Sequence, residues 1–352
     1  MWDSTMFLNF ISHNIQVAQF YSDNHPHIVC EHGRHKFTSM MSFLGGKDML
    51  KSVDVPGTNT QIKVTQEVLR RLLVGMFVRC QHLHSEGKTL EGCFSADNMF
   101  VPDQDVFMIP YIEVKLDSLR MEAFKPYTDE GGDKDLMKLG VIVEDVILSS
   151  ETELPADLKQ LFVLLRTEPI KNKNLIYCHV SLKGPRGKLS HFMWLYKRLT
   201  YLQKKVPSKY EKIMLKFKDD KDNWRKRANR NKFLAKLRPF NTCGRGGYSK
   251  HGKGLSRFYR NSVEHLLKMF DDNNPNSGTK PEEHEKKAHP ASPVEEEELE
   301  DYHIAIILTQ AFPEFLGDLQ EAFHEQNELQ RFNTEDTVPL QNAAPAVATS
   351  EC

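Results

Sequence analysis

The chain has 352 residues, of which 39% are hydrophobic and 27% are charged, proportions typical of a folded protein with a sizeable core. Its net charge of −1 excludes a uniformly basic protein, and no apolar run approaches the ~20 residues needed to span a bilayer. The six cysteines form no CxxC pair or zinc-type cluster and fit a reducing compartment, which we expect to be cytoplasmic or nuclear.

The first half of the chain predicts a mixture of helices and short strands. Apolar side chains recur at intervals of three and four in residues 64–84, which makes this stretch the clearest amphipathic helix. Two short apolar runs around a turn are interpreted as strands. In chain order we expect a helix at 6–21, a strand at 25–33, the helix at 64–84, strands at 99–102 and 106–114, and buried helices at 135–148 and 157–167.

The second half predicts helices interrupted by one long insertion. Residues 272–300 are poor in apolar side chains and rich in Pro, Asn, Ser and Glu, a composition typical of disorder. Order returns at residues 301–323, and residues 333–352 are expected to form a disordered tail. The predicted helices lie at 191–205, 208–218, 221–236 and 254–271.

Positive charge is concentrated in one block of this half. Between Lys197 and Arg260 the chain has 21 Lys or Arg residues and 4 Asp or Glu residues. Such a block predicts a local surface for a polyanion, and RNA is the polyanion that we favour. Trp224, Phe233 and Tyr248 would then be available to stack on bases. The alternative is a surface that only keeps the protein in solution.

Residues 82–101, HLHSEGKTLEGCFSADNMFV, resemble the catalytic segment of protein kinases. Cys93 stands where that family has its catalytic Asp, and Glu91 stands where it has the preceding His. A thiol does not orient a substrate hydroxyl as a carboxylate does, so we expect no kinase activity. The positions that match the kinase pattern are Leu83, His84, Gly87 and Asn98.

Other parts of the kinase pattern are present in weakened form. Ile15 replaces the Glu of a kinase helix, the Gly-rich loop and the Lys-bearing strand would precede Met1, and the Asp-Phe-Gly motif is missing near residues 108–111. The resemblance implies a degenerate, N-truncated kinase-like domain over residues 1–187. The alternative is a set of buried helices and strands of an unrelated fold. The positions that fit the central helix of the kinase C-lobe are Asp135, Leu139 and Gly140.

Three short motifs follow one another in the second half. The first comprises His191, Trp194, Lys197, Arg198, Leu199, Tyr201 and Leu202. The second comprises Leu255, Arg257, Arg260, Asn261 and His265, with Ser256 in place of a Leu. The third comprises Leu308, Thr309, Phe312, Pro313, Phe315 and Leu316.

The order and content of these motifs resemble the kinase-extension nuclease (KEN) domain. That domain follows the kinase fold in 2-5A-dependent RNase L and in the endoplasmic-reticulum stress-sensing kinase/endoribonucleases. The resemblance implies a mainly α-helical protein, in which a truncated kinase-like lobe with few short strands precedes an all-α KEN domain. That second domain would cover residues 188–332 and contain the insertion at 272–300.

The second motif places its polar residues on one side of a helix. Arg257, Asn261 and His265 are spaced four residues apart and therefore stack along one face. A solvated helix face without a catalytic role is the simpler interpretation of this motif taken alone. The adjoining stripe, which we expect to be buried, comprises Leu255, Phe258, Tyr259, Ser262, Leu266 and Met269.

The resemblance assigns a role to each polar residue. His265 would be the general acid, Arg260 and Asn261 would hold the scissile phosphate, and Tyr248 would assist as the base. Tyr248 lies twelve residues before Arg260, where the family has about thirteen, and Gly247 occupies the expected position. The residues expected to bind RNA phosphates are Arg257, Lys253 and Lys250.

These residue types suit cleavage of RNA without a metal. Histidine transfers protons near neutral pH, and the planar guanidinium of arginine can bind two phosphate oxygens. RNA supplies its own nucleophile, the 2′-hydroxyl, so cleavage would leave a 2′,3′-cyclic phosphate. We expect no cofactor.

The implied function is an endoribonuclease in mRNA processing, mRNA decay or stress signalling of the unfolded-protein-response type. A homodimer is implied, or a heterodimer with a related kinase/endoribonuclease. The alternative is a catalytically inactive regulator with the same fold, which would bind RNA or pair with an active relative.

Overall fold

The computed structural model describes residues 30–32, 35–102, 111–117, 119, 121–217, 224–237, 248, 252–271 and 300–329. The predicted helix at 6–21, most of the predicted strand at 25–33, most of the insertion at 272–300 and the tail at 333–352 lie outside these residues. Within them the chain is mainly helical with a few short strands, which confirms the predicted class. None of the described helices combines the length and the apolar character required to cross a bilayer.

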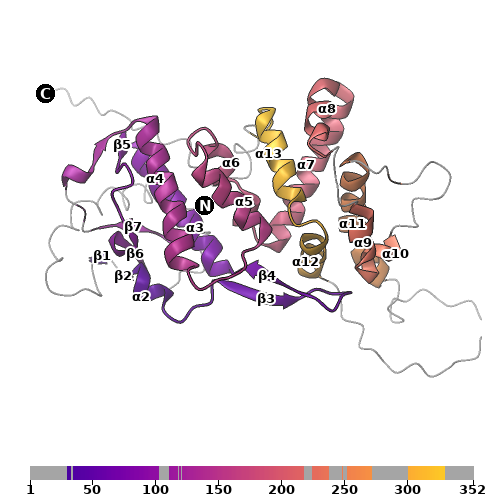
Figure 1. The fold of residues 1–352 in the computed structure, drawn as a ribbon, viewed down its shortest axis with the longest axis horizontal. Helices are drawn as coiled ribbons and strands as arrows, with labels where there is room; N and C mark the ends of the chain where they lie inside the picture. The colour runs from indigo at the N-terminus through magenta and orange to yellow at the C-terminus, as the bar shows by residue number, and fades with distance from the viewer. Residues whose placement is uncertain are drawn as a thin grey trace, which may run out of the picture.

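Short antiparallel strands lie at one end of the first half (Figure 1). Four of them form a sheet in the order β1 (Cys30–His32), β2 (His35–Ser39), β6 (Met99–Pro102) and β7 (Lys115–Leu116). Strands β3 (Leu50–Asp54) and β4 (Gln61–Thr65) form a separate hairpin, and β5 (Lys88–Thr89) pairs with β8 (Lys125–Pro126). The predicted strand at 99–102 is confirmed as β6.

The helices of the first half are α2 (Met40–Leu44), α3 (Glu67–Ser85), α4 (Asp129–Ile142), α5 (Ala156–Arg166) and α6 (Lys173–Tyr177). Helix α3 buries Leu69, Leu72 and Met76 almost completely, because these side chains recur on one side of the helix. Helix α4 continues into a π-helical turn, Val143–Ile147. The predicted helices at 64–84, 135–148 and 157–167 are therefore confirmed, and together they enclose the first hydrophobic core.

The helices of the second half surround another core. They are α7 (Pro185–Lys205), α8 (Pro207–Leu215), α9 (Trp224–Asn229), α10 (Lys232–Leu237), α11 (Gly252–Asp271), α12 (Asp301–Ala311) and α13 (Phe315–Glu325). Buried residues before about residue 175 belong mainly to the first core, and those after about residue 180 belong to the second core. The predicted single helix at 221–236 is wrong, because Asn231 interrupts it. The Asn231 side-chain oxygen accepts the amide hydrogen of Phe233 at 2.9 Å and so begins a new helix.

Arg198, from the first of the three motifs, takes part in a buried ion pair. Arg198 donates from Nε and Nη2 to the carboxylate of Glu328, at 2.9 and 2.5 Å, and Lys209 donates to it at 2.6 Å. Burial opposes ionisation of Glu328, yet these hydrogen bonds and charges hold its pKa below the usual value. Arg198 therefore fastens α7 to the chain that follows α13.

Hairpin β3–β4 connects the two halves, and sequence periodicity did not predict it. Figure 1 shows the hairpin running from the first half toward α12. Val53, Ile62 and Val64 pack against the second core. At the tip, the amide of Asn231 donates to the carbonyl of Pro56 at 2.7 Å. Residues of the first half thus help to position α9 and α10.

A glycine at the hairpin tip makes this contact possible. Gly57 has a φ of +82°, and the amide of Thr58 donates to the carbonyl of Val55 at 3.1 Å, as in a type II turn. A β-carbon at Gly57 would lie 2.6 Å from Cδ2 of Phe233 and 2.9 Å from Oδ1 of Asn231. The turn therefore requires glycine for both its backbone angle and its packing.

Replacing Gly57 with alanine should destabilise the protein more than the matched change at Gly46. Gly46 has a φ of +75° and open space around it, so Gly46→Ala should cost only the left-handed backbone penalty of about 1–2 kcal/mol. Gly57→Ala should cost a further ~1–3 kcal/mol, because Phe233 must move. Urea unfolding of both variants measures the difference, and equal losses would show that the hairpin tip is not closely packed.

Candidate functional site

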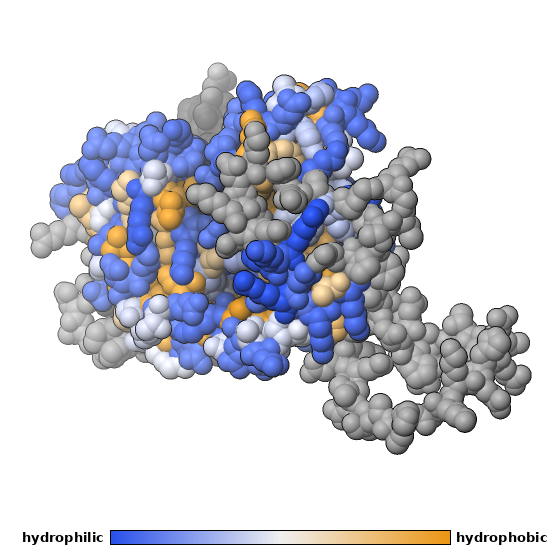
Figure 2. Space-filling view, turned by 45° about the vertical axis from the view of Figure 1, so that its right-hand side comes forward, coloured by the Kyte–Doolittle hydropathy of each residue, from blue (hydrophilic) through white to orange (hydrophobic). Residues whose placement is uncertain are grey.

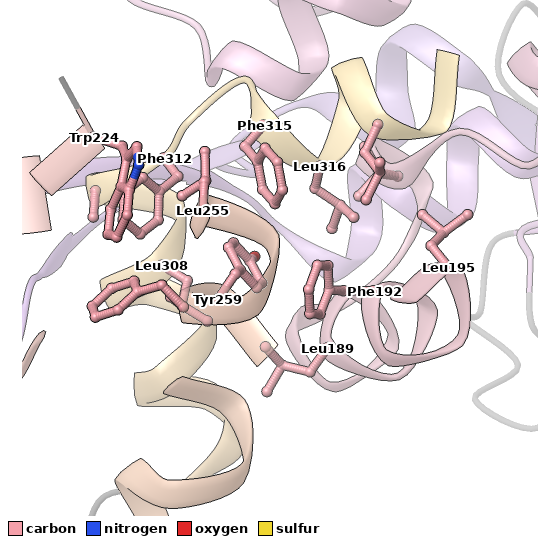
Figure 3. Close-up of a cluster of buried hydrophobic side chains, with 14 of the residues drawn as sticks. Leu189, Phe192, Leu195, Trp224, Leu255, Tyr259, Leu308, Phe312, Phe315 and Leu316 are labelled. Carbon is pink, nitrogen blue, oxygen red and sulfur yellow. The ribbon is translucent and has the colours of Figure 1, made fainter. Parts of the chain in front are cut away.

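Helix α11 is fixed by its apolar side. Phe258 and Tyr259 are 0% and 4% exposed, and the Tyr259 ring lies 4.2 Å from that of Phe192 on α7. Figure 3 shows Tyr259 pointing into the same cluster as Phe192, Phe312 and Phe315. The predicted buried stripe is confirmed from Leu255 to Leu266, whereas the side chain of Met269 lies outside the described residues.

Three predicted site residues form a hydrogen-bonded chain on the other flank of α11. The side-chain amide of Asn261 donates to the hydroxyl of Tyr248 at 2.8 Å. Its carbonyl oxygen accepts a hydrogen bond from Nη1 of Arg260 at 2.9 Å. Tyr248 therefore reaches Asn261 despite the loop that is one residue shorter than expected.

Tyr248 is held by its ring, and its hydroxyl meets the side chain of Asn261. The residue is 6% exposed, and its ring meets those of Phe258 and Trp224 edge-on, at 5.3 and 5.9 Å. Burial raises the pKa of its phenol, against the opposing effects of the Asn261 hydrogen bond and the charges of Arg257 and Arg260. At neutral pH the hydroxyl therefore keeps its proton.

Arg260 has a second partner that the sequence analysis did not consider. Nη2 of Arg260 lies 2.5 Å from a carboxylate oxygen of Glu264, one helical turn along. Both side chains are about one-third exposed, so solvent weakens the pair. An incoming phosphate would compete with Glu264 for the guanidinium. The spacing of four residues between Arg260 and Glu264 was the signal that could have revealed this pair.

The remaining predicted site residues of α11 are on its outer surface. His265 is exposed and lies four residues after Asn261, so the two share a helix face. Arg257, one turn before Asn261, and Lys253 are also exposed. Lys250 lies outside the described residues. The face thus carries a histidine, an amide and two arginines, which can transfer a proton and bind an anion.

The predicted base-stacking role of two aromatic residues is wrong. Trp224 is 0% exposed and Tyr248 is 6% exposed, because both rings fill the second core. Phe233 is half-buried and lies against the hairpin tip at Gly57. Any contact of this face with RNA would therefore depend on charge and hydrogen bonds.

Residues 84–92 of the first half are organised around one buried carboxylate, that of Asp135. Asp135 is 1% exposed and accepts hydrogen bonds from Thr89 at 2.6 Å and from the amides of Leu90 and Gly92 at 3.1 and 2.8 Å. His84 Nε2 lies 3.0 Å from the same carboxylate. Burial alone would raise the pKa of Asp135, but these hydrogen bonds lower it below the usual value.

Asn98 and Cys93, which follow these residues, contact backbone groups of the first half. Asn98 accepts the amide hydrogen of Ser95 at 2.9 Å, and its amide lies 3.4 Å from the carbonyl of Asp117. Cys93 is exposed, and its sulfur lies 4.0 Å from the carbonyl of Glu91. Glu91 has a φ of +51° and lies between Leu90 and Gly92, whose amides donate to Asp135. The Asp135 hydrogen bonds therefore hold an unusual backbone conformation at Glu91.

Cys80, His84 and Asp135 have potential metal-ligand atoms within 4.8 Å of one another. Burial, together with the nearby charge of Asp135, raises the pKa of the Cys80 thiol well above its ordinary value, which disfavours the thiolate that metals bind. The Asp135 carboxylate is already occupied by four partners. This group is therefore better suited to holding α3, α4 and the loop together than to binding an ion.

No family model, curated protein or solved structure matches this chain.

Neutralising Glu264 should strengthen binding of phosphate-bearing ligands. Glu264→Gln frees Arg260 from an ion pair worth about 0.5 kcal/mol, so affinity for a short RNA hairpin should rise about twofold. Fluorescence anisotropy at fixed ionic strength measures this change. Glu211→Gln, which removes an exposed carboxylate of α8, is the matched control for net charge. Equal effects of the two changes would contradict competition at Arg260.

Proposed function

We propose that this chain is a metal-independent endoribonuclease of the KEN type, and that α11 carries its active site. The observation that supports this most is the hydrogen-bonded chain from Tyr248 through Asn261 to Arg260. These residues were selected as site residues because of a resemblance, and Tyr248 is distant enough in sequence that a contact with Asn261 was not required by helix geometry. Exposed His265 completes the set on the same face.

In the proposed reaction the 2′-hydroxyl of RNA gives its proton to solvent water and attacks the adjacent phosphorus, and the bond to the 5′-oxygen breaks. Arg260 and the amide of Asn261 bind the phosphate oxygens and stabilise the charge that develops on them. Protonated His265 donates its proton to the leaving 5′-oxygen. The products are a 2′,3′-cyclic phosphate and a 5′-hydroxyl.

The raised pKa of Tyr248 refines its role in this mechanism. A phenol that keeps its proton at neutral pH is a poor base but a good hydrogen-bond donor. Its oxygen already accepts from Asn261, which leaves the hydroxyl hydrogen available. We assign Tyr248 to donate to a phosphate oxygen and to fix the orientation of the Asn261 amide.

Positive charge around α11 supports RNA as the substrate. Figure 2 shows hydropathy, which does not distinguish the sign of charge, and the coloured residues of this view are largely hydrophilic with apolar areas between them. Sequence-independent attraction to phosphates is the main source of non-specific nucleic-acid affinity. The exposed Lys and Arg residues from α7 to α11 are Arg186, Lys197, Lys204, Lys205, Lys212, Lys216, Lys226, Arg230, Lys232, Lys236, Lys253 and Arg257.

The hydrogen bonds of Asp135 support a degenerate kinase-like lobe in the first half. Two segments that were matched separately to the kinase pattern meet there, because Asp135 accepts from the amides of Leu90 and Gly92. The exposed thiol of Cys93 occupies the position of the catalytic carboxylate, so this lobe would not transfer phosphate. We propose that it pairs two nuclease halves in a dimer in the cytoplasm or nucleus.

The second candidate function is a regulator that binds RNA or an active relative without cleaving RNA. The ion pair between Arg260 and Glu264 favours this alternative, because it neutralises the guanidinium that must bind the phosphate. The two functions differ in one result, which is whether RNA is cut when metal is removed.

Wild-type protein should cleave a hairpin RNA in the presence of EDTA and leave a 2′,3′-cyclic phosphate end. His265→Ala should lower the single-turnover rate about 10²–10⁴-fold, the usual contribution of a general acid. His324→Ala, which removes a half-buried histidine from α13, is the matched control and should change the rate little. Mass spectrometry of the cut end identifies the product. Absence of cleavage by dimeric wild-type protein, or equal rates for wild type and His265→Ala, would favour the regulator.

A further inference from the structure

A cleft of about 310 Å³ lies where the two halves meet, away from the proposed nuclease site. Its walls come from hairpin β3–β4, the first turn of α3, the beginning of α7 and the first turns of α12. This volume is at the lower end of the ~300–1,000 Å³ that small-molecule sites occupy. Figure 1 shows the hairpin running from the first half toward α12, and the hairpin residues that line the cleft, Lys51, Val64 and Thr65, lie at the end opposite its tip.

Cations dominate the polar lining of the cleft. Lys51, Arg70, Lys183 and Lys188 all contribute to it, against one carboxylate, that of Glu67. Arg70 pairs with Glu67, and Lys188 pairs with buried Asp157 at 2.6 Å. Within the described part of the chain, neither Lys51 nor Lys183 forms an ion pair. Two positive charges, one from β3 and one from the segment before α7, are therefore left for an anion.

Two further features of the cleft favour an anion. Thr65 is 6% exposed, and its buried hydroxyl has no hydrogen-bond partner among the described residues. Pro185, the first residue of α7, lines the cleft, and α7 has no side-chain cap at Gly184, so the positive end of the helix dipole lies at this wall. Free amides at a helix N-terminus attract phosphate, and a buried hydroxyl without a partner is unusual in a folded protein.

The remaining wall is apolar and includes one aromatic ring. Val64, Ala305 and Ile306 line it, together with Tyr302, which is 36% exposed. A phenol ring at the edge of an apolar wall suits a flat, unsaturated ring. Positive charge and an aromatic ring within one cleft match the two parts of a nucleotide.

We propose that this cleft binds a mononucleotide, with its phosphate between Lys51, Lys183 and the first turn of α7, and its base against Tyr302. The site is separate from the kinase-like segment. Arg70 and His84 are fourteen residues apart on α3, which corresponds to about 21 Å along the helix axis. It is also independent of whether α11 cleaves RNA.

Binding here would connect the two halves. Lys51 belongs to the hairpin, whereas Lys183 precedes α7 and Tyr302 belongs to α12. A ligand that contacts all three stabilises the arrangement of the hairpin against the second core, because it binds only when the walls are assembled. The hairpin tip in turn contacts Asn231, at the start of α10.

Isothermal titration calorimetry of the full chain with AMP, ADP, adenosine and inorganic phosphate tests the proposal. AMP and ADP should bind more tightly than either adenosine or phosphate alone. Lys183→Gln should weaken AMP binding about tenfold or more, the usual effect of losing one charge-assisted hydrogen bond. Lys159→Gln, which changes an exposed lysine of α5 outside the cleft, is the matched control and should bind AMP like wild type.

Tyr302→Ala tests the contribution of the base to binding separately from that of the phosphate. It should weaken AMP binding several-fold and leave phosphate binding unchanged, and circular dichroism checks that each variant remains helical. Undetectable AMP binding at millimolar concentration would overturn the proposal, and so would equal affinity for adenosine and AMP. Loss of AMP binding in Lys159→Gln as large as in Lys183→Gln would overturn it as well. Phosphate binding as tight as that of AMP, with no effect of Tyr302→Ala on AMP, would replace the nucleotide with a simple anion.

Discussion

Phe258 and Tyr259 anchor α11 in the second core, through rings that contact Trp224, Phe192 and Phe312. This anchoring fixes the rotation of α11 about its axis, and each residue of a helix is turned by about 100° from the one before. Asn261 is therefore held where the Tyr248 hydroxyl meets it, since the ring of Tyr248 packs on Phe258. Ordinary core packing thus assembles the polar chain on which the proposed function depends.

Helices and their buried sides could be predicted from the sequence where apolar residues recur at short, regular intervals. The intervals of three and four in residues 64–84 and 254–271 predicted α3 and α11 and the buried side of each. Long-range packing was not accessible in this way. The burial of Trp224 depends on contacts with Tyr248 and Phe258. The position of hairpin β3–β4 depends on the packing of Gly57 against Phe233. Six-residue helices such as α9 are too short for periodicity to identify.

The same residues support both an active and an inactive interpretation of the site. Arg260 lies between Asn261, which a nuclease needs, and Glu264, which competes with the phosphate. The proposed kinase-like lobe illustrates a similar contrast, because Asp135 holds a hydrogen-bonded loop beside Cys93, which would stand in place of the catalytic carboxylate. A scaffold can keep its internal hydrogen bonds after its chemistry has changed, since buried polar groups need partners in either case. A measurement of proton transfer by His265 distinguishes the active interpretation from the inactive one.

The assignment of His265 as the general acid is tested most directly with an RNA hairpin whose leaving 5′-oxygen is replaced by sulfur. A thiolate, with a pKa of about 8.5 for its conjugate acid, leaves without a proton, so the substitution removes the need for an acid. We expect His265→Ala to cleave the sulfur substrate at nearly the wild-type rate, whereas Arg260→Ala should remain slow on both substrates. An equal loss in His265→Ala on the oxygen and sulfur substrates would contradict this assignment.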